Sequence, residues 1–429
     1  MTPPREGGPD GHTPQDHRHV WPTVRGFAAT RLLGNLFVRA PYVFITEISR
    51  GLGVSVETMT VVLGVRELGG LGSPVAGRLV DNGHGAAVIA AGGVLVGISC
   101  LLAATPWFPV FVVVMVLGAF AKNSIDLAQN AWVGHEVPVT KRARVIGFIE
   151  TTWAGSFLLG VPIIGFATDR FGWRSGFLIT GPILALLAVG SGASLRRSQQ
   201  GAAEDEPVGA PAARPTGSAA TSTGSAATHH ALEAIANPAR LRRAIWAFFC
   251  LQPFSQMLVF AVNGDWFAGH LAMSNTQLSF ATAALGVAEL VGVAWVIAYA
   301  DRLGPVRVGG VAIGLAAIPS LILIAMSNSA VGNSAVFGVA MLLLMDLAME
   351  ASFVATLPIV TELDVDNRGR SVAQAFVVML VSRAVASAAG GAIYTRLGFN
   401  ATLLTSATLC VAGCAALTWA RRGPRLEAT

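Results

Sequence analysis

Long apolar stretches, separated by short polar segments, recur along almost the whole chain. About 20 consecutive apolar residues are what one helix needs to cross the hydrocarbon core of a bilayer. Backbone polar groups in lipid must pair within the structure, so segments this apolar are predicted to be helices. The pattern predicts twelve spanning helices, at approximately 27–48, 57–80, 86–105, 109–132, 144–168, 175–195, 243–263, 277–299, 306–326, 334–358, 371–394 and 400–420.

The composition agrees with this pattern. Hydrophobic residues make up 53% of the 429 positions and charged residues only 12%, and the mean hydropathy is +0.61. A soluble domain carries about twice that fraction of charge. The net charge of +5 comes from basic residues scattered between apolar stretches, so no nucleic-acid partner is expected. The predicted fold class is an all-α protein embedded in a lipid bilayer.

A segment rich in Ala, Gly, Ser, Thr and Pro interrupts the helices near the middle of the chain. Such a composition is typical of a linker, because it cannot bury a core. The linker leaves two halves of six helices each. The predicted organisation is a disordered cytoplasmic tail at 1–24, an N-terminal bundle at 25–197, a cytoplasmic linker at 198–240, a C-terminal bundle at 241–422 and a cytoplasmic tail at 423–429.

The basic residues are distributed unevenly between the two sides of the predicted bundle. If the N-terminus lies inside, most Lys and Arg residues fall on the cytoplasmic side, as the positive-inside rule requires. We therefore predict a multi-pass protein of the plasma membrane with both termini in the cytoplasm.

A charged turn that carries a glycine occurs four times, as VDNGHG, TDRFG, ADRLG and YTRLG. Asp81, Asp169, Asp301 and Thr395 hold equivalent positions, about 90 residues apart once the linker is left out, which is the length of about three spans with their loops. Three is an odd number, so successive copies are inverted in the membrane. Inverted repeats that meet at a central site are typical of secondary transporters.

The first turn resembles the signature Gly-x-Leu-x-Asp-Arg-x-Gly-Arg-Arg, which follows the second helix in the major facilitator superfamily. Gly77, Leu79 and Asp81 match it, whereas Asn82 replaces the first basic residue. The resemblance to this superfamily extends over nearly all of residues 25–422.

Other segments add to the resemblance. KRARVIG and NRGRSVA are similar to the family's loops between helices four and five and between helices ten and eleven. GVPIIG resembles a glycine-proline motif on helix five of drug:proton antiporters, although Val161 separates Gly160 from Pro162. The resemblance implies a secondary transporter of that efflux branch, which we expect to act as a monomer without a cofactor.

The resemblance also implies that the turns are gates. An Asp at a helix end can accept hydrogen bonds from a neighbouring helix N-terminus or pair with an Arg across the bundle. For Asp169 and Arg170 we favour simple helix capping. The predicted gating-turn residues are Gly77, Asp81, Asp301, Arg302 and Gly304.

Charged side chains also lie in the middle of several predicted helices. A charge at the bilayer centre costs at least a few kcal/mol, so it usually faces a cavity or a partner. The candidates for proton coupling or substrate binding are Arg39, Glu67, Lys122, Asp126, Glu150, Glu289, Asp346, Glu350 and Arg383.

Some of these charges have an alternative interpretation. Lys122 and Asp126 are four residues apart and could neutralise each other on one helix. Arg66 and Glu67 are adjacent, so we expect them not to face each other. Arg39 and Arg383 each require a partner from another helix.

Two acidic pairs stand out among the candidates. Asp346 and Glu350 share a helix face, where one of two like charges is expected to hold a proton and could carry it during transport. The segments GVREL and GVAEL place Glu67 and Glu289 on the corresponding helices two and eight, so we expect these two residues to share a place in the fold.

Uncharged polar and aromatic residues on the same helices are predicted to line a cavity for a small-molecule substrate. These cavity-lining candidates are Asn35, Tyr42, Trp153, Gln252 and Gln256.

The two lysines of the chain exclude ATP as its direct source of energy. A Walker A loop, which binds ATP, needs Gly-Lys, but Lys122 and Lys141 follow Ala121 and Thr140. We predict neither an enzyme nor a metal site.

The first hypothesis for the function is a proton-coupled exporter of a small organic molecule. The alternatives are an importer or uniporter of an organic anion, suggested by the cations of the N-terminal half, and a transporter-like sensor that moves nothing.

Overall fold

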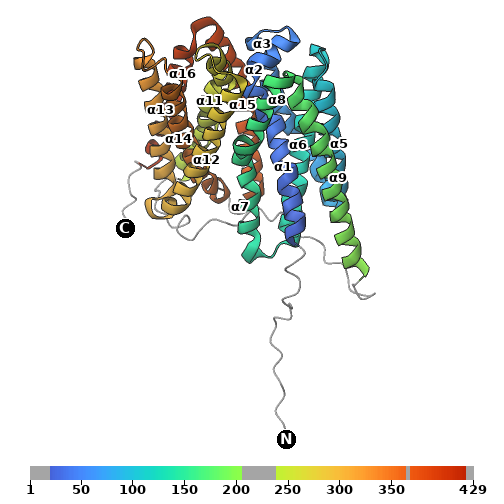
Figure 1. Cartoon of the computed structure of the whole chain (residues 1–429). Helices are drawn as coiled ribbons and strands as arrows, with labels where there is room; N and C mark the ends of the chain where they lie inside the picture. The colour runs from blue at the N-terminus through green and yellow to red at the C-terminus, as the bar shows by residue number, and fades with distance from the viewer. Residues whose placement is uncertain (1–19, 205–237, 364–367, 422–429) are drawn as a thin grey trace, which may run out of the picture.

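The computed structural model of the protein describes residues 20–204, 238–363 and 368–421, without the side chains of a few of them, Asp301 included. Within these ranges the chain forms helices and no strands. The helices run side by side in two groups, with the N-terminal half in blue to green and the C-terminal half in yellow to red (Figure 1).

The helices of the N-terminal half include three short 3₁₀ or π segments, labelled η. In chain order they are α1 (Val20–Val43), α2 (Ile45–Leu52), α3 (Val56–Glu67), η2 (Leu68–Gly72), α4 (Ser73–Leu79), η3 (Val80–His84), α5 (Gly85–Ala103), α6 (Phe108–Glu136), α7 (Val139–Gly155), η4 (Ser156–Gly160), α8 (Val161–Phe171) and α9 (Arg174–Glu204).

The C-terminal half consists of longer, less interrupted helices. They are α11 (Pro238–Gly269), α12 (Asn275–Leu303), α13 (Pro305–Met326), α14 (Ala335–Glu362), α15 (Arg368–Leu397) and α16 (Phe399–Arg421).

The chain makes twelve passes, as the hydrophobic pattern predicts. Ten helical stretches of the described residues are long and apolar enough to cross a membrane, and one of them, Val56–Ala103, contains two passes because the chain turns back at Gly83. The remaining pass is α1 continued by α2, whose sequence is interrupted by charged residues. We call the face where α1 begins and α16 ends the terminal face, and the opposite face the far face.

The four repeated turns owe their recurrence to one backbone requirement. Gly83, Gly172, Gly304 and Gly398 have φ angles of 82°, 82°, 84° and 84°. Glycine adopts such positive φ values without the steric cost that other residues incur. The turns alternate between the terminal face and the far face, so the structure agrees with four inverted three-helix units.

Several boundaries differ from the sequence-based prediction. The first helix begins at Val20, inside the predicted tail, and α11 begins at Pro238, inside the predicted linker. The first pass, predicted as one helix, breaks at Phe44 (φ −98°, ψ 29°), shortly after Pro41. A proline inside a helix removes a backbone hydrogen bond and favours such a break. The sixth pass continues to Glu204, into the segment predicted as a linker. The rest of that linker up to 237 and most of both predicted tails lie outside the described residues.

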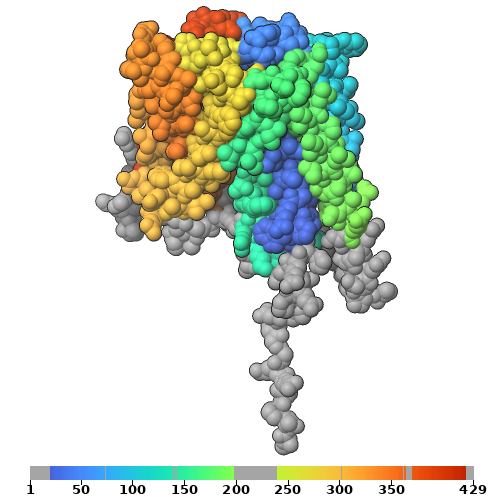
Figure 2. All heavy atoms as spheres, viewed as in Figure 1, coloured from blue at the N-terminus to red at the C-terminus, as the bar shows by residue number. Residues whose placement is uncertain are grey.

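The two halves meet along two seams. In seam one, α3 packs against α15, and in seam two, α12 packs against α7, η4 and α8. On the side shown in Figure 2, atoms of both halves cover the far face at the top, whereas the lower part of α1, in blue, is visible between α7 and α9.

Candidate functional site

The charges in the interior of the bundle lie at the two seams, inside the N-terminal half and on α14. We call them the charged layer, and all of them except Asp346 and Glu350 take part in the ion pairs described below. Its members are Arg31 and Arg39 on α1, Arg66 and Glu67 on α3, Lys122 and Asp126 on α6, Glu150 on α7, Glu289 on α12, Asp346 and Glu350 on α14, and Arg383 on α15.

Seam one contains a glutamate held by two arginines. Arg383 Nε donates to Glu67 Oε2 at 3.1 Å, and Arg66 Nη2 donates to Glu67 Oε1 at 2.9 Å. Arg66 is fully buried, and its guanidinium carbon lies 4.9 Å from the centre of the Tyr42 ring. The expectation that Arg66 and Glu67 do not face each other is wrong, because the long arginine side chain carries its guanidinium back to the adjacent carboxylate.

Seam two contains a glutamate held by one arginine. Both terminal nitrogens of Arg39 contact the Glu289 carboxylate, and both side chains are 4% exposed. Arg39 Nη1 also donates to the carbonyl oxygen of Trp153 at 2.8 Å. The guanidinium carbon lies 3.2 Å from the centre of the Phe157 ring, a cation–π arrangement. Arg39 and Arg383 are thus each paired with a carboxylate of the opposite half.

The segments GVREL and GVAEL play equivalent parts in the two seams. Glycine and glutamate are three residues apart in both, which places them on one helix face. A Cβ on Gly64 would clash with the carbonyl oxygen of Ala384, and a Cβ on Gly286 would lie 2.8 Å from that of Ala154. In each seam, therefore, a glycine lets the two halves approach closely and a glutamate pairs across the contact.

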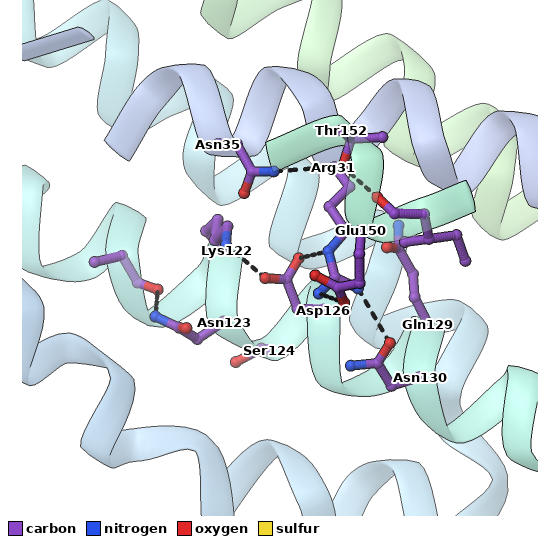
Figure 3. Close-up of polar contacts among 12 residues, drawn as sticks. Arg31, Asn35, Lys122, Asn123, Ser124, Asp126, Gln129, Asn130, Glu150 and Thr152 are labelled. Atoms are coloured by element: carbon purple, nitrogen blue, oxygen red, sulfur yellow. Dashed lines mark hydrogen bonds and ion pairs between the residues drawn. The ribbon is translucent and has the colours of Figure 1, made fainter. Parts of the chain in front are cut away.

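The N-terminal half contains a closed network of charges centred on Arg31 (Figure 3). Arg31 Nη2 lies 2.8 Å from Glu150 Oε1, its Nη1 donates to Asn130 Oδ1 at 3.1 Å, and its Nε lies 3.7 Å from Asp126 Oδ1. Lys122 Nζ lies 2.6 Å from Asp126 Oδ2, so the pairing of these two on one helix does occur. The Glu150 side chain is nevertheless 53% exposed.

Two carboxyl groups of the charged layer, those of Asp346 and Glu350 on α14, have no cationic partner among the described residues. Asp346 accepts a hydrogen bond of 3.4 Å from Gln256 Nε2, but its Oδ2 atom is buried and has no partner. Glu350 makes no hydrogen bond or ion pair with any described residue, and it is half-buried. Both groups interact electrostatically with Glu289 and Arg39. Negative charge is therefore in excess beside seam two.

The residues predicted to line a cavity divide into two groups. Asn35, Tyr42 and Gln252 are at most 1% exposed, so neighbouring helices pack over them. The expectation that these three line a cavity is therefore not met in this structure. Gln252, for example, donates to a backbone carbonyl of α14 at 3.3 Å. Trp153 and Gln256 are partly exposed.

The predicted gating turns on the terminal face make few contacts. Asp81 is exposed and forms no hydrogen bond or ion pair with another described residue, and Arg302 is also exposed. A Cβ on Gly77 would only just reach Leu127, at 4.0 Å. Gly304 ends α12 and precedes α13, while the side chain of Asp301 lies outside the described part.

The Asp169 turn on the far face caps a helix, as expected, and in addition joins the two halves. Asp169 accepts hydrogen bonds of 2.5 to 3.2 Å from the backbone and side chains of Asn275 and Thr276. It does cap a helix, but that helix is α12 of the opposite half, so the cap also joins the halves. The sequence shows the turn but not which helix lies opposite it.

Two further polar contacts join the halves at the far face. Arg396, in the fourth turn, lies 2.8 Å from Glu57 of α3. Asp265 of α11 accepts hydrogen bonds from Thr46 at 2.7 Å and Tyr394 at 3.0 Å. Together with Asp169 and its donors, we call these contacts the far-face latch. Within the described residues, no group of three or more His, Cys, Asp or Glu side chains is placed to hold a metal ion.

The fold and the charged layer are those of a helical membrane transporter, and comparisons give its family. The sequence model of the Major Facilitator Superfamily matches residues 30–262, more than half of the chain, so the protein belongs to this family. It is a transporter and not an enzyme. A comparison with curated protein sequences gives no match.

Solved structures of transporters share the fold over nearly the whole chain. The crystal structure of a D-xylose-proton symporter has a TM-score of 0.73 and 15% sequence identity, and the match covers 95% of this chain and 99% of that one. A bacterial homolog to the human lysosomal transporter Spinster, in an inward-facing and unoccupied conformation, has a TM-score of 0.66 and 13% identity, covering 94% and 95%. At these identities the likeness concerns the fold alone.

Proposed function

We propose that the protein is a proton-coupled secondary transporter that exports a small organic molecule across the plasma membrane by alternating access. The observation that carries this proposal is the pair of carboxyl groups without a cation, Asp346 and Glu350, beside a cross-half ion pair at mid-membrane. A buried carboxyl group without a counter-charge is far less costly when it holds a proton. A group that gains and loses a proton in such a place can couple proton movement to a change of conformation.

The distribution of contacts between the halves supports alternating access. The far-face latch holds one side closed, whereas the side chain of Glu150, on α7, is still 53% exposed. If the basic loops are cytoplasmic, the terminal face is the inner one and this conformation faces inward. In the opposite conformation the latch is broken, and the exposed Asp81 turn becomes the contact that closes the terminal face.

Export, rather than import, is supported by the fifth pass. Gly160 and Pro162, which resemble the motif of drug:proton antiporters, lie where the π turn η4 passes into α8. Gly160 packs closely on Leu36 of α1, because a Cβ there would come within 3.0 Å of that side chain. A π turn beside a proline is a place where a helix can bend. We therefore assign the bending of this pass to the export cycle.

The other candidate functions have less support in the arrangement of charges. The organic-anion alternative depends on the cations of the N-terminal half, and each of these contacts a carboxylate. The sensor alternative predicts ligand binding without flux, so a flux measurement separates it from transport.

The test is proton movement in proteoliposomes that contain the full-length monomer and an internal pH dye. We expect a panel of cationic, neutral and anionic compounds to include one class that evokes a pH change, and the sign of the change separates antiport from symport. Asp346→Asn and Glu350→Gln should abolish the response. Glu47→Gln, which alters a partly exposed carboxylate paired within its own half, is the matched control. Downhill flux of a labelled compound without any pH change would refute proton coupling.

A further inference from the structure

The cations and carboxylates of the charged layer are not paired one to one. Every cation in it contacts a carboxylate: Arg31, Arg39, Arg66, Lys122 and Arg383 all take part in ion pairs. Among the carboxylates of the charged layer, only Asp346 and Glu350 lack a cation within the described part of the chain. The negative charge without a counter-charge therefore lies in the C-terminal half.

The negative charge of Asp346 and Glu350 and the positive charge of seam one differ in how accessible they are to a ligand. Arg66 and Arg383 share the single carboxylate of Glu67, which leaves one positive charge in excess there. Arg66, however, is fully enclosed and covered by the ring of Tyr42, so a ligand cannot reach it without repacking. Arg383, whose side chain is 16% exposed, is held by Glu67. Glu350, in contrast, is half-buried and free of hydrogen bonds to the described residues.

The surroundings of the two carboxyl groups suit a cation with an apolar body. Asp346 is nine-tenths buried, and its unpartnered Oδ2 atom is a vacant acceptor. Gln256, which donates to the other oxygen, lies one turn from Phe260 on α11. Phe260 is partly exposed, and aromatic faces attract organic cations.

We infer that the transported molecule is an organic cation, bound by the carboxyl groups of Asp346 and Glu350 beside Gln256 and Phe260. The inference rests on the proposed function and names its substrate class. Protons and the cation occupy the same two carboxyl groups in turn, so binding of one releases the other. A monovalent cation on this pair restores the missing counter-charge in the same way as a proton.

The dependence of binding on pH involves every charged group that faces this pair. These groups are Glu289 on α12, Arg39 on α1 and Arg383 on α15, while α11 contributes the neutral Gln256. The only charged residue of α13, Arg307, lies at the terminal end of that helix. Arg39 is already paired with Glu289, and Arg383 with Glu67. We therefore expect acidification to weaken cation binding by protonating Asp346 and Glu350.

The test is equilibrium binding to the purified full-length protein in detergent. The probes are tetraphenylphosphonium, ethidium and dodecylamine as cations, with tetraphenylborate as an anion of the same shape as the first. We expect at least one cation to bind, at least tenfold more tightly at pH 8.5 than at pH 5.5, and tetraphenylborate not to bind. Glu350→Gln and Asp346→Asn should each weaken cation binding at least tenfold, whereas the control Glu47→Gln should not change it.

The outcomes separate this inference from the proposed function. Binding of none of the three cations, or equal binding of tetraphenylborate, would overturn the inference. Proton movement evoked in proteoliposomes only by anions or neutral compounds would keep proton-coupled transport and refute the cation. Cation binding without proton movement would keep the cation and refute the coupling. If a variant fails to fold, the pH dependence of the wild-type protein decides, because binding that does not weaken in acid contradicts a shared site.

Discussion

The two seams are built from the same five-residue segment, yet their charges differ. In seam one, Glu67 is held by two arginines, one from each half. In seam two, Glu289 is held by Arg39 alone, with two further carboxyl groups nearby. The repeat thus supplies a common way of joining the halves. The charges added around it hold the glutamate of seam one between two arginines and leave two carboxyl groups without a counter-charge beside seam two.

The largest effect on this comparison is expected from Glu67→Gln. It leaves two arginines in the interior without a carboxylate, and breaking a buried ion pair typically costs about 3 to 5 kcal/mol. We expect the thermal unfolding midpoint of the detergent-solubilised protein to fall by about 10 °C. Glu289→Gln should cost less, because Arg39 keeps its hydrogen bond to Trp153 and its contact with Phe157. Equal losses would contradict the difference between the seams.

The next effect concerns the glycines of the two seams. Gly64→Ala and Gly286→Ala each add a methyl group against a backbone oxygen, and such overpacking costs about 1 to 3 kcal/mol. The contact is tighter at Gly64, so its variant should lose more stability and more transport. Gly147→Ala is the control, because a Cβ there meets no atom within 4 Å. A larger loss at Gly286 would reverse the order.

A smaller effect on stability, with a large effect on coupling, is expected from Asp346→Asn. Removing a buried charge that has no counter-charge should leave the free energy of unfolding unchanged or raise it by about 1 kcal/mol. Substrate-evoked proton movement should nevertheless disappear. Calorimetry and the pH dye measure the two properties on the same preparation. A fall in stability as large as that of Glu67→Gln would show that Asp346 has a structural partner.

The smallest effect is expected at the far face. Arg396→Ala breaks an exposed ion pair between the halves, and such pairs contribute about 0 to 1 kcal/mol. We expect little change in stability but a measurable increase in the outward-open population, seen as a longer distance between spin labels on the two halves. Arg50→Ala breaks an exposed pair within one half and should leave that distance unchanged.

Much of the fold could be predicted from the sequence because bilayer thickness and glycine geometry act locally. The length of the apolar stretches predicted the twelve passes, and the recurring turn predicted the four three-helix units. The break at Phe44 could not be foreseen, since Pro41 alone does not say where a helix bends. The site was only partly predictable. The similarity of the segments around Glu67 and Glu289 indicated equivalent places, but their arginine partners lie on other helices, and only packing brings them together.

The errors have physical reasons of the same kind. Polar residues such as Asn35 and Gln252 can be enclosed by neighbouring helices as readily as they can line a cavity. The sequence indicated that Asp169 caps a helix, but it does not show that this helix is α12, whose N-terminus lies across the seam. Both the enclosure of these polar residues and the helix that Asp169 caps depend on which helices are neighbours in the fold.

The matched charges of the charged layer also have an electrical consequence. In the proposed cycle, Arg39 with Glu289 and Lys122 with Asp126 move as neutral units when the halves rock, so they transfer no net charge across the membrane. The excess positive charge of seam one is the same in both directions of the cycle, so the charge that differs between them is the load of Asp346 and Glu350. Exchange of two protons for one monovalent cation would move one elementary charge per cycle, which a potential of 100 mV drives with about 2.3 kcal/mol. On this stoichiometry the membrane voltage, and not the proton gradient alone, sets how far the substrate can be expelled.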